Sequence, residues 1–167
     1  MRLRRIPWLW LNMMACAIWL VYIVFVRTPA QEKDCVGNLS KVLLGLQIYS
    51  LDNDDRLPLS ESWADATLAY VDKKSDFRCA MLNTRDTDQY GHAFNSQLSG
   101  KRIEEVRPDK TMPILFDSRS TRWGAFGGMN LLPESPRNGK GHGVAFIVGA
   151  ALVPRSELPG VLDRPVP

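Results

Sequence analysis

An uninterrupted apolar run near the N-terminus constrains this chain more than any other feature. The run Trp8–Val26 reads WLWLNMMACAIWLVYIVFV and contains no charged side chain. As an α-helix it would be roughly 28 Å long, close to the ~30 Å hydrocarbon core of a bilayer. Arg2, Arg4 and Arg5 precede it, and positive charge marks the cytoplasmic side of a span. The sequence therefore predicts a cytoplasmic segment at 1–7 followed by a transmembrane anchor at 8–26.

This topology would place the rest of the chain outside the cytoplasm. We expect a single-pass protein of the bacterial inner membrane, with the lipid bilayer as one partner and a periplasmic C-terminal domain. A cleaved signal peptide is the competing interpretation, because Thr28-Pro29-Ala30 weakly resembles a small-residue cleavage site. The apolar run exceeds the usual signal-peptide core of about 7–15 residues, which favours an uncleaved anchor.

Charge gives no reason to expect a nucleic-acid partner. The chain has 21 basic and 18 acidic residues, and Arg2, Arg4, Arg5 and Arg27 belong to the flanks of the apolar run. The remaining chain keeps 17 basic residues against all 18 acidic ones, a net charge of −1. Without a basic patch, this part of the chain lacks the electrostatic signature of a nucleic-acid-binding protein.

The three cysteines suggest one disulfide. Cys16 lies in the predicted span, so the pair of thiols that would share an oxidising compartment is Cys35 with Cys79. On the chain-entropy model this bond would stabilise the fold by roughly 4 kcal/mol. Two buried free thiols are the alternative. Because the sequence has no Cys-x-x-Cys and no Cys/His ligand spacing, it predicts no zinc site.

A long amphipathic helix is expected after the apolar run. Thr28-Pro29-Ala30-Gln31 has the form of a capping box, with Thr28 as N-cap. The apolar residues that then share one helical face are Cys35, Leu39, Val42, Leu43, Leu46 and Tyr49. Leu44, Ile48 and Leu51 widen this stripe, so we expect a substantial covering surface such as a sheet. Gly37 and Gly45 either mark close packing or are weak helix positions that tertiary contacts tolerate.

The second half of the chain has the pattern of short strands. From Phe77 onward, short apolar pieces alternate with turn residues, after a short helix expected at Trp63–Val71. Helices first and strands later indicate an α+β fold, with an antiparallel sheet packed on the long helix. The pieces VAFIV and AALV predict a terminal hairpin about Gly149. This domain is expected at 28–153, followed by an extended tail at 154–167.

Candidate sites for chemistry are weak. Asp52, Asp54 and Asp55 offer clustered oxygen ligands, but the segment lacks the calcium loop with its closing Glu, and a solvated helix end is the better interpretation. No Gly-x-Ser-x-Gly nucleophile motif is present to pair with His92 or His142. A thiol dyad of Cys79 with either histidine is a formal alternative, which the predicted disulfide would abolish. His142 lies in GKGHG, which does not open a helix after a strand, so it is not a phosphate loop. The sequence predicts no catalytic residue, no metal and no cofactor.

The order of these segments resembles that of type II secretion pseudopilins and the type IV pilin-like superfamily, specifically a group with a C-terminal His-(nine residues)-Asp-Gly motif. The segments that carry the resemblance are Cys35-Val36-Gly37-Asn38-Leu39-Ser40-Lys41, Asp52–Pro58, Trp63–Val71, Phe77-Arg78-Cys79-Ala80, Tyr90–Asn95 and Pro113–Asp117. The resemblance implies a long N-terminal helix that runs from the membrane onto an antiparallel sheet, and it implies no catalytic residues.

The chain departs from this group at both ends. Members that prepilin peptidase processes have a Gly before the apolar segment and a Glu five residues into it, whereas here Arg5-Ile6-Pro7-Trp8 stands at the junction and no Glu precedes position 32. At the C-terminal motif, Val148 takes the place of the Asp and Asn138 that of the His.

The resemblance implies a non-enzymatic, membrane-anchored structural or accessory component of a secretion- or pilus-like envelope assembly. Its partners would be other pilin-like subunits or further copies of the chain, which we expect to pack on the helix near Leu39, Leu43 and Leu46. The alternative is a membrane-tethered module that does not assemble and that binds an envelope polymer or a protein. Trp123 and Phe126 would form its binding surface, since an aromatic ring between Arg and Gly can stack on a sugar.

Overall fold

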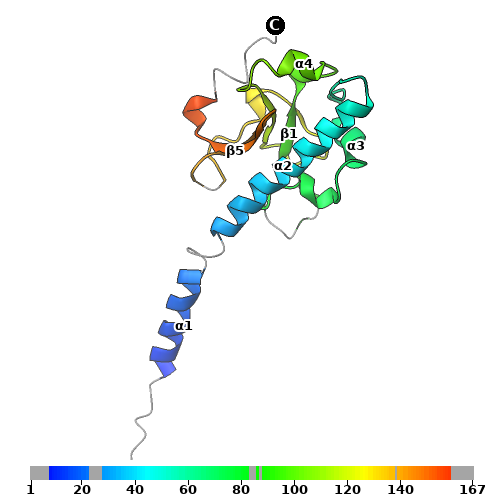
Figure 1. The fold of residues 1–167 in the computed structure, drawn as a ribbon. Helices are drawn as coiled ribbons and strands as arrows, with labels where there is room; N and C mark the ends of the chain where they lie inside the picture. The colour runs from blue at the N-terminus through cyan, green and yellow to red at the C-terminus, as the bar shows by residue number, and fades with distance from the viewer. Residues whose placement is uncertain (1–7, 23–27, 83–85, 87, 138, 159–167) are drawn as a thin grey trace, which may run out of the picture.

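The structure is a computed structural model that describes residues 8–22, 28–82, 86, 88–137 and 139–158 (Figure 1). Within these residues the helices are α1 (Trp8–Tyr22), α2 (Thr28–Asp52), α3 (Trp63–Leu68) and α4 (Ile103–Val106). The strands are β1 (His92–Asn95), β2 (Pro113–Asp117), β3 (Phe126–Gly127), β4 (His142–Phe146) and β5 (Gly149–Val153). Short 3-10 helices are η2 (Lys74–Phe77), η3 (Ser96–Leu98), η4 (Met129–Leu131) and η5 (Arg155–Glu157).

The predicted transmembrane anchor is wrong. The described part of the apolar run forms α1, Trp8–Tyr22. Among the helices of the described residues, none combines the length and the apolar character that crossing a membrane requires. The expectation of a single-pass inner-membrane protein with a periplasmic domain is overturned with it. Residues 23–26 of the predicted span lie outside the described residues.

The fold is α+β, but its sheet is mixed rather than antiparallel. Five strands lie in the order β3-β1-β2-β4-β5. The pairs β1–β2, β2–β4 and β4–β5 are antiparallel, whereas β1 and β3 run parallel. The parallel pair was missed because β3 is two residues long and carries no readable alternation. The predicted terminal hairpin is confirmed as β4–β5, with a turn that begins two residues earlier than expected.

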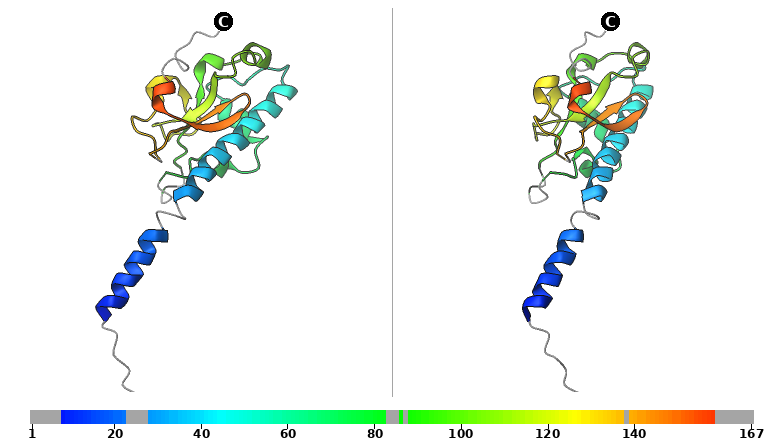
Figure 2. Two further views of the ribbon diagram at one scale, coloured as in Figure 1. Left: turned by 60° about the vertical axis from the view of Figure 1, so that its left-hand side comes forward. Right: turned by 90° about the vertical axis from the view of Figure 1, so that its left-hand side faces the viewer.

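α2 packs along one side of the sheet, and α1 extends away from it (Figures 1 and 2). The main core lies between α2 and the sheet and contains Leu39, Leu46, Phe94, Leu115 and Ala145. We call the described residues from Thr28 to Leu158 the sheet domain. Its length of chain is enough to bury a core of this size without α1.

The outward face of α2 contradicts the expected width of its apolar stripe. Leu39, Val42, Leu43 and Leu46 are buried, as the helical spacing predicted. Leu44, Ile48 and Leu51 are instead 56%, 39% and 71% exposed. The physical reason is that a single sheet covers one face of a helix, while these three side chains point to the other. We call Leu44, Ile48 and Leu51 the outer face of α2.

The opposite side of the sheet has its own smaller core. Successive side chains of a strand alternate between its faces, so Ala93, Phe116 and Val144 point away from α2. Ala125, Leu132 and Leu158 cover them. Leu158 is 1% exposed, so the chain just after β5 packs on the sheet, whereas residues 159–167 of the expected tail lie outside the described residues.

Candidate functional site

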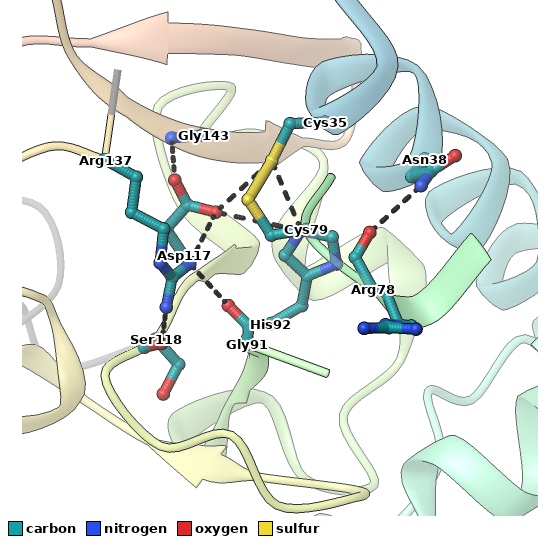
Figure 3. Close-up of a disulfide and its surroundings, with 10 residues drawn as sticks. All are labelled: Cys35, Asn38, Arg78, Cys79, Gly91, His92, Asp117, Ser118, Arg137 and Gly143. Carbon is teal, nitrogen blue, oxygen red and sulfur yellow. Dashed lines mark hydrogen bonds and ion pairs between the residues drawn. A yellow bond between two sulfur atoms is a disulfide. The ribbon is translucent and has the colours of Figure 1, made fainter. Parts of the chain in front are cut away.

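The disulfide between Cys35 and Cys79 is confirmed. Cys35 lies on the buried side of α2, and Cys79 follows η2, with their Cα atoms 4.8 Å apart. Both side chains are buried. Next to the bond, the Asn38 side-chain amide donates to the Arg78 backbone carbonyl at 2.9 Å, which fixes the loop that carries Cys79 against α2 (Figure 3).

Two further polar side chains face this disulfide. His92 begins β1 and Asp117 ends β2, and the antiparallel register places the two residues opposite each other. His92 Nε2 lies 3.8 Å from Cys35 Sγ and 3.7 Å from Asp117 Oδ1. Asp117 Oδ1 in turn lies 3.8 Å from Cys35 Sγ (Figure 3). We call Cys35, Cys79, His92 and Asp117 the Cys-His-Asp cluster.

The carboxylate of Asp117 is held in place from two sides. The Gly143 backbone N–H donates to Oδ2 at 2.7 Å, and the Arg137 guanidinium lies 3.6 Å from Oδ1. Arg137 also donates to the backbone carbonyls of Gly91 and Ser118, so its charge is fixed rather than mobile (Figure 3). Oδ1 is therefore the oxygen that faces the rest of the cluster.

Burial shifts the protonation of both groups toward the neutral form. Desolvation is the main cause that raises the pKa of Asp117 to about 6, against the opposing effects of the Gly143 N–H and Arg137. Desolvation also lowers the pKa of His92 to about 3, and the positive charge of Arg137 adds to this shift. His92 is consequently neutral at pH 7.

The cluster gathers four candidate metal-ligand atoms, yet its closed surroundings do not suit catalysis. The ligand atoms lie within 4.8 Å of one another, and all four residues are buried. A nucleophile or a general base must reach its substrate, and these groups are cut off from solvent. Sequence reasoning paired Cys35 with Cys79 and considered Cys79 with His92, but it missed Asp117 and the gathering of all four residues. They come from α2, a loop and two strand ends, with no regular spacing between them.

Of the acidic residues considered as weak metal ligands, Asp52 ends α2, and Asp54 and Asp55 lie in the turn that follows. Asp52, Asp54 and Asp55 are exposed. Asp54 and Asp55 have φ values of 53° and 58°, a left-handed conformation that Asp tolerates better than most residues. The Asp55 carbonyl accepts from the Ile103 N–H at 2.7 Å. Among the described residues these carboxylates do not converge into a ligand group.

Trp123 and Phe126, the residues expected in a binding surface, lie in different settings. Trp123 is partly buried, and its ring packs against Phe77 and Tyr90 at centroid distances of 5.0 and 4.8 Å. Its indole N–H donates to Asp65 at 2.8 Å. Phe126 is 39% exposed in the short strand β3. The Trp123 ring therefore stabilises the sheet domain internally, and its polar atom is already occupied.

Apolar side chains are exposed on the two long helices. Side chains of α1 from Asn12 to Tyr22 are exposed, and Ile18 and Trp19 are 64% and 62% exposed. The outer face of α2 adds a second stripe, bordered by a hollow of ≈ 200 Å³ that Tyr70 and Val71 help to line. Leu39, Leu43 and Leu46, the residues expected to meet a partner, are instead buried against the sheet of their own chain.

Comparison with known proteins supplies no relative. No protein-family model, curated protein or solved structure matches this chain.

Proposed function

We propose that this protein is a non-enzymatic, pilin-like subunit that acts as a structural or accessory component of a secretion- or pilus-like assembly. The observation that carries the proposal is the pair of uncovered apolar helix surfaces, on α1 and on the outer face of α2. Exposing the apolar side chains of such a helix to water is unfavourable, and contact with another surface that covers them lowers the free energy.

The occupant that fits the outer face of α2 is α1 of a second copy of the chain. Leu44, Ile48 and Leu51 recur at the i, i+4, i+7 spacing of one helical stripe, and α1 offers a complementary apolar helix. α1 of the same chain extends away from the sheet domain, so it leaves this stripe uncovered (Figure 2). Contact between α1 of one copy and α2 of the next is heterologous, and such contacts repeat along a row of subunits.

Cysteine crosslinking tests this contact, because the chain already has one of the two thiols that the experiment needs. Cys16 is exposed on α1, and Cys35 and Cys79 are occupied by their disulfide. In an Ile48→Cys variant, mild oxidation should link Cys16 of one copy to position 48 of another and give a ladder longer than a dimer. Peptide mass spectrometry of the linked product identifies the two cysteines.

Two matched variants control the experiment. Ser135→Cys places a thiol at an exposed position in the loop between η4 and β4 and should give no ladder. Ile48→Cys combined with Cys16→Ser should stop at a dimer, because only one reactive thiol remains. The proposed assembly is rejected if two results occur together. Crosslinked peptides that contain Cys16 are no more abundant in Ile48→Cys than in Ser135→Cys, and the protein sediments as a monomer.

A further inference from the structure

The Cys-His-Asp cluster has the ligand set of a structural zinc site. Thiolate sulfur, imidazole nitrogen and carboxylate oxygen are the three ligand types that Zn²⁺ accepts in proteins, and structural sites take four of them in a tetrahedron. Here the four residues come from four separate segments, and their ligand atoms lie within 4.8 Å of one another. All four are buried, as in structural metal sites that keep no open position.

The distances between these atoms suit a metal better than direct hydrogen bonds. His92 Nε2, Asp117 Oδ1 and Cys35 Sγ form a triangle with sides of 3.7, 3.8 and 3.8 Å. An N–H···O hydrogen bond spans about 2.7–3.2 Å, so the His92–Asp117 side is too long for one. Zinc bonds of about 2.0–2.3 Å at tetrahedral angles separate the ligand atoms by roughly 3.3–3.8 Å. Three edges of the tetrahedron are therefore already close to the required length.

Residues around the cluster supply the support that metal ligands need. The Gly143 N–H fixes Asp117 Oδ2 at 2.7 Å and leaves Oδ1 directed at the cluster, as outer partners do in metal sites. Two thiolates and one carboxylate would give Zn²⁺ a net charge of −1. The Arg137 guanidinium, 3.6 Å from Oδ1 and mostly buried, offsets that charge. The absence of a side chain at Gly143 also leaves space for the Asp117 carboxylate, since a Cβ there would come within 3.2 Å of both Asp117 oxygens.

We infer that reduction of the Cys35–Cys79 disulfide converts the Cys-His-Asp cluster into a Zn²⁺ site held by Cys35, Cys79, His92 and Asp117. A dithiol reductant gives two electrons and two protons to the S–S bond, which breaks into two thiols while the dithiol becomes a disulfide. Zn²⁺ then displaces the two thiol protons to solvent and binds both thiolates. The bond and the metal exclude each other, because both use the same sulfur electrons.

This arrangement would let the protein keep its link between α2 and the sheet in either redox state. The disulfide ties Cys35 on α2 to the loop after η2 under oxidising conditions. Zinc would tie the same two residues together, and β1 and β2 as well, under reducing conditions. A fold that depends on this link would otherwise lose it on reduction.

Cobalt titration of the full chain tests the inference. A Cys16→Ser background leaves Cys35 and Cys79 as the only cysteines. After reduction with a phosphine, which avoids dithiols that bind metal themselves, the metal-free protein is titrated with Co²⁺. We expect one Co²⁺ per chain, with thiolate-to-cobalt charge-transfer absorption and the intense visible bands of a tetrahedral site. Zn²⁺ should displace the cobalt, and the oxidised protein should show no such bands.

Variants then separate four ligands from two thiolates alone. His92→Ala and Asp117→Asn should each weaken Co²⁺ binding by at least about tenfold and alter the visible bands. The matched control replaces Asp52, Asp54 and Asp55 together by Asn, and should bind Co²⁺ like the parent because these exposed carboxylates lie outside the cluster. Absence of charge-transfer bands in the reduced protein overturns the inference. Unchanged affinity and bands in both single variants do so as well.

Circular dichroism during the titration covers the case in which reduction unfolds the chain. If the reduced, metal-free protein is unfolded, addition of Zn²⁺ should restore the oxidised protein's spectrum, since metal binding and folding are then coupled. A reduced protein that stays unfolded in excess Zn²⁺ contradicts the proposed site. The outcome is independent of subunit assembly, which the crosslinking experiment measures separately.

Discussion

His92 and Asp117 face each other across the strand pair β1–β2, and folding shifts their pKa values in opposite directions. Both shifts have the same main cause, which is the cost of burying a charge. His92 is neutral above about pH 3 and Asp117 is neutral below about pH 6. Between these values the pair is buried as two neutral groups, without the desolvation penalty of a buried ion pair.

These shifts predict opposite pH dependences of stability. Folding raises the pKa of Asp117 from 3.8 to about 6, so its contribution is present below pH 3.8 and is lost as the pH rises through about 6. Folding lowers the pKa of His92 from 6.5 to about 3, so its contribution is present above pH 6.5 and is lost as the pH falls toward 3. Between pH 4 and 6 the two effects oppose each other.

Removing either group should uncover the effect of the other. Relative to the parent, Asp117→Asn should lose free energy of unfolding as the pH falls from 6 to 4, and His92→Gln should gain it. The slope differences should approach about 1 kcal/mol per pH unit. Urea unfolding of the oxidised protein at half-unit pH steps measures them. His142, whose pKa burial also lowers, is present in all three proteins and cancels in the comparison. Parallel profiles would contradict this prediction.

At the scale of elements, two glycines of α2 have opposite surroundings. A Cβ on Gly45 would lie 2.5 Å from Val71 Cγ2 and 3.2 Å from the Tyr70 carbonyl oxygen, so this glycine lets the segment after α3 approach the helix closely. A Cβ on Gly37 would meet nothing within 4 Å. One glycine therefore serves packing, while the other only lowers the helix propensity of α2.

Alanine at these two positions should change stability with opposite signs. Gly37→Ala should raise the free energy of unfolding by about 0.5–1 kcal/mol, because Ala is the better helix former and nothing obstructs it. Gly45→Ala should lower it by about 1–2 kcal/mol, since overpacking outweighs the same propensity gain. Urea unfolding of both variants checks the pair, and an equal gain in both would show that the Val71 segment moves away at no cost.

Periodicity in the sequence predicted where helices and strands lie better than it predicted which of their side chains are covered. The helical spacing of Leu39, Val42 and Leu46 correctly indicated the buried face of α2, and the apolar pieces about Gly149 indicated the β4–β5 hairpin. The same pattern also counted Ile48 as a covered residue, because composition alone cannot show how wide the covering surface is. The outer face of α2 became visible once the sheet was seen to lie on one side of the helix.

The Cys-His-Asp cluster shows what spacing along a sequence cannot reveal. The disulfide followed from counting thiols, and the structure confirms it. His92 and Asp117 join it only because β1 and β2 pair in one particular register, and register depends on long-range contacts. The membrane prediction rested on the length of an apolar run, and among the helices of the described residues none combines the length and the apolar character that crossing a membrane requires.

At the scale of the whole molecule, α1 and the sheet domain differ in what they contribute to the stability of a single copy. The two buried cores lie within the sheet domain. The described side chains of α1 are exposed, and the helix extends away from the sheet domain (Figure 1). α1 therefore contributes little to the stability of a single copy. If it packs on the outer face of α2 in another copy, its contribution appears only in the assembly.

Deleting residues 1–27 should separate these two contributions. The shortened chain keeps α2, the sheet and the disulfide, so its free energy of unfolding should change by less than about 0.5 kcal/mol at low protein concentration. Its self-association should be lost, because the helix that covers the outer face of α2 is gone. Urea unfolding and sedimentation of the same sample measure both quantities. A shortened chain that fails to fold would show that α1 belongs to the core, and one that still associates would place the contact elsewhere.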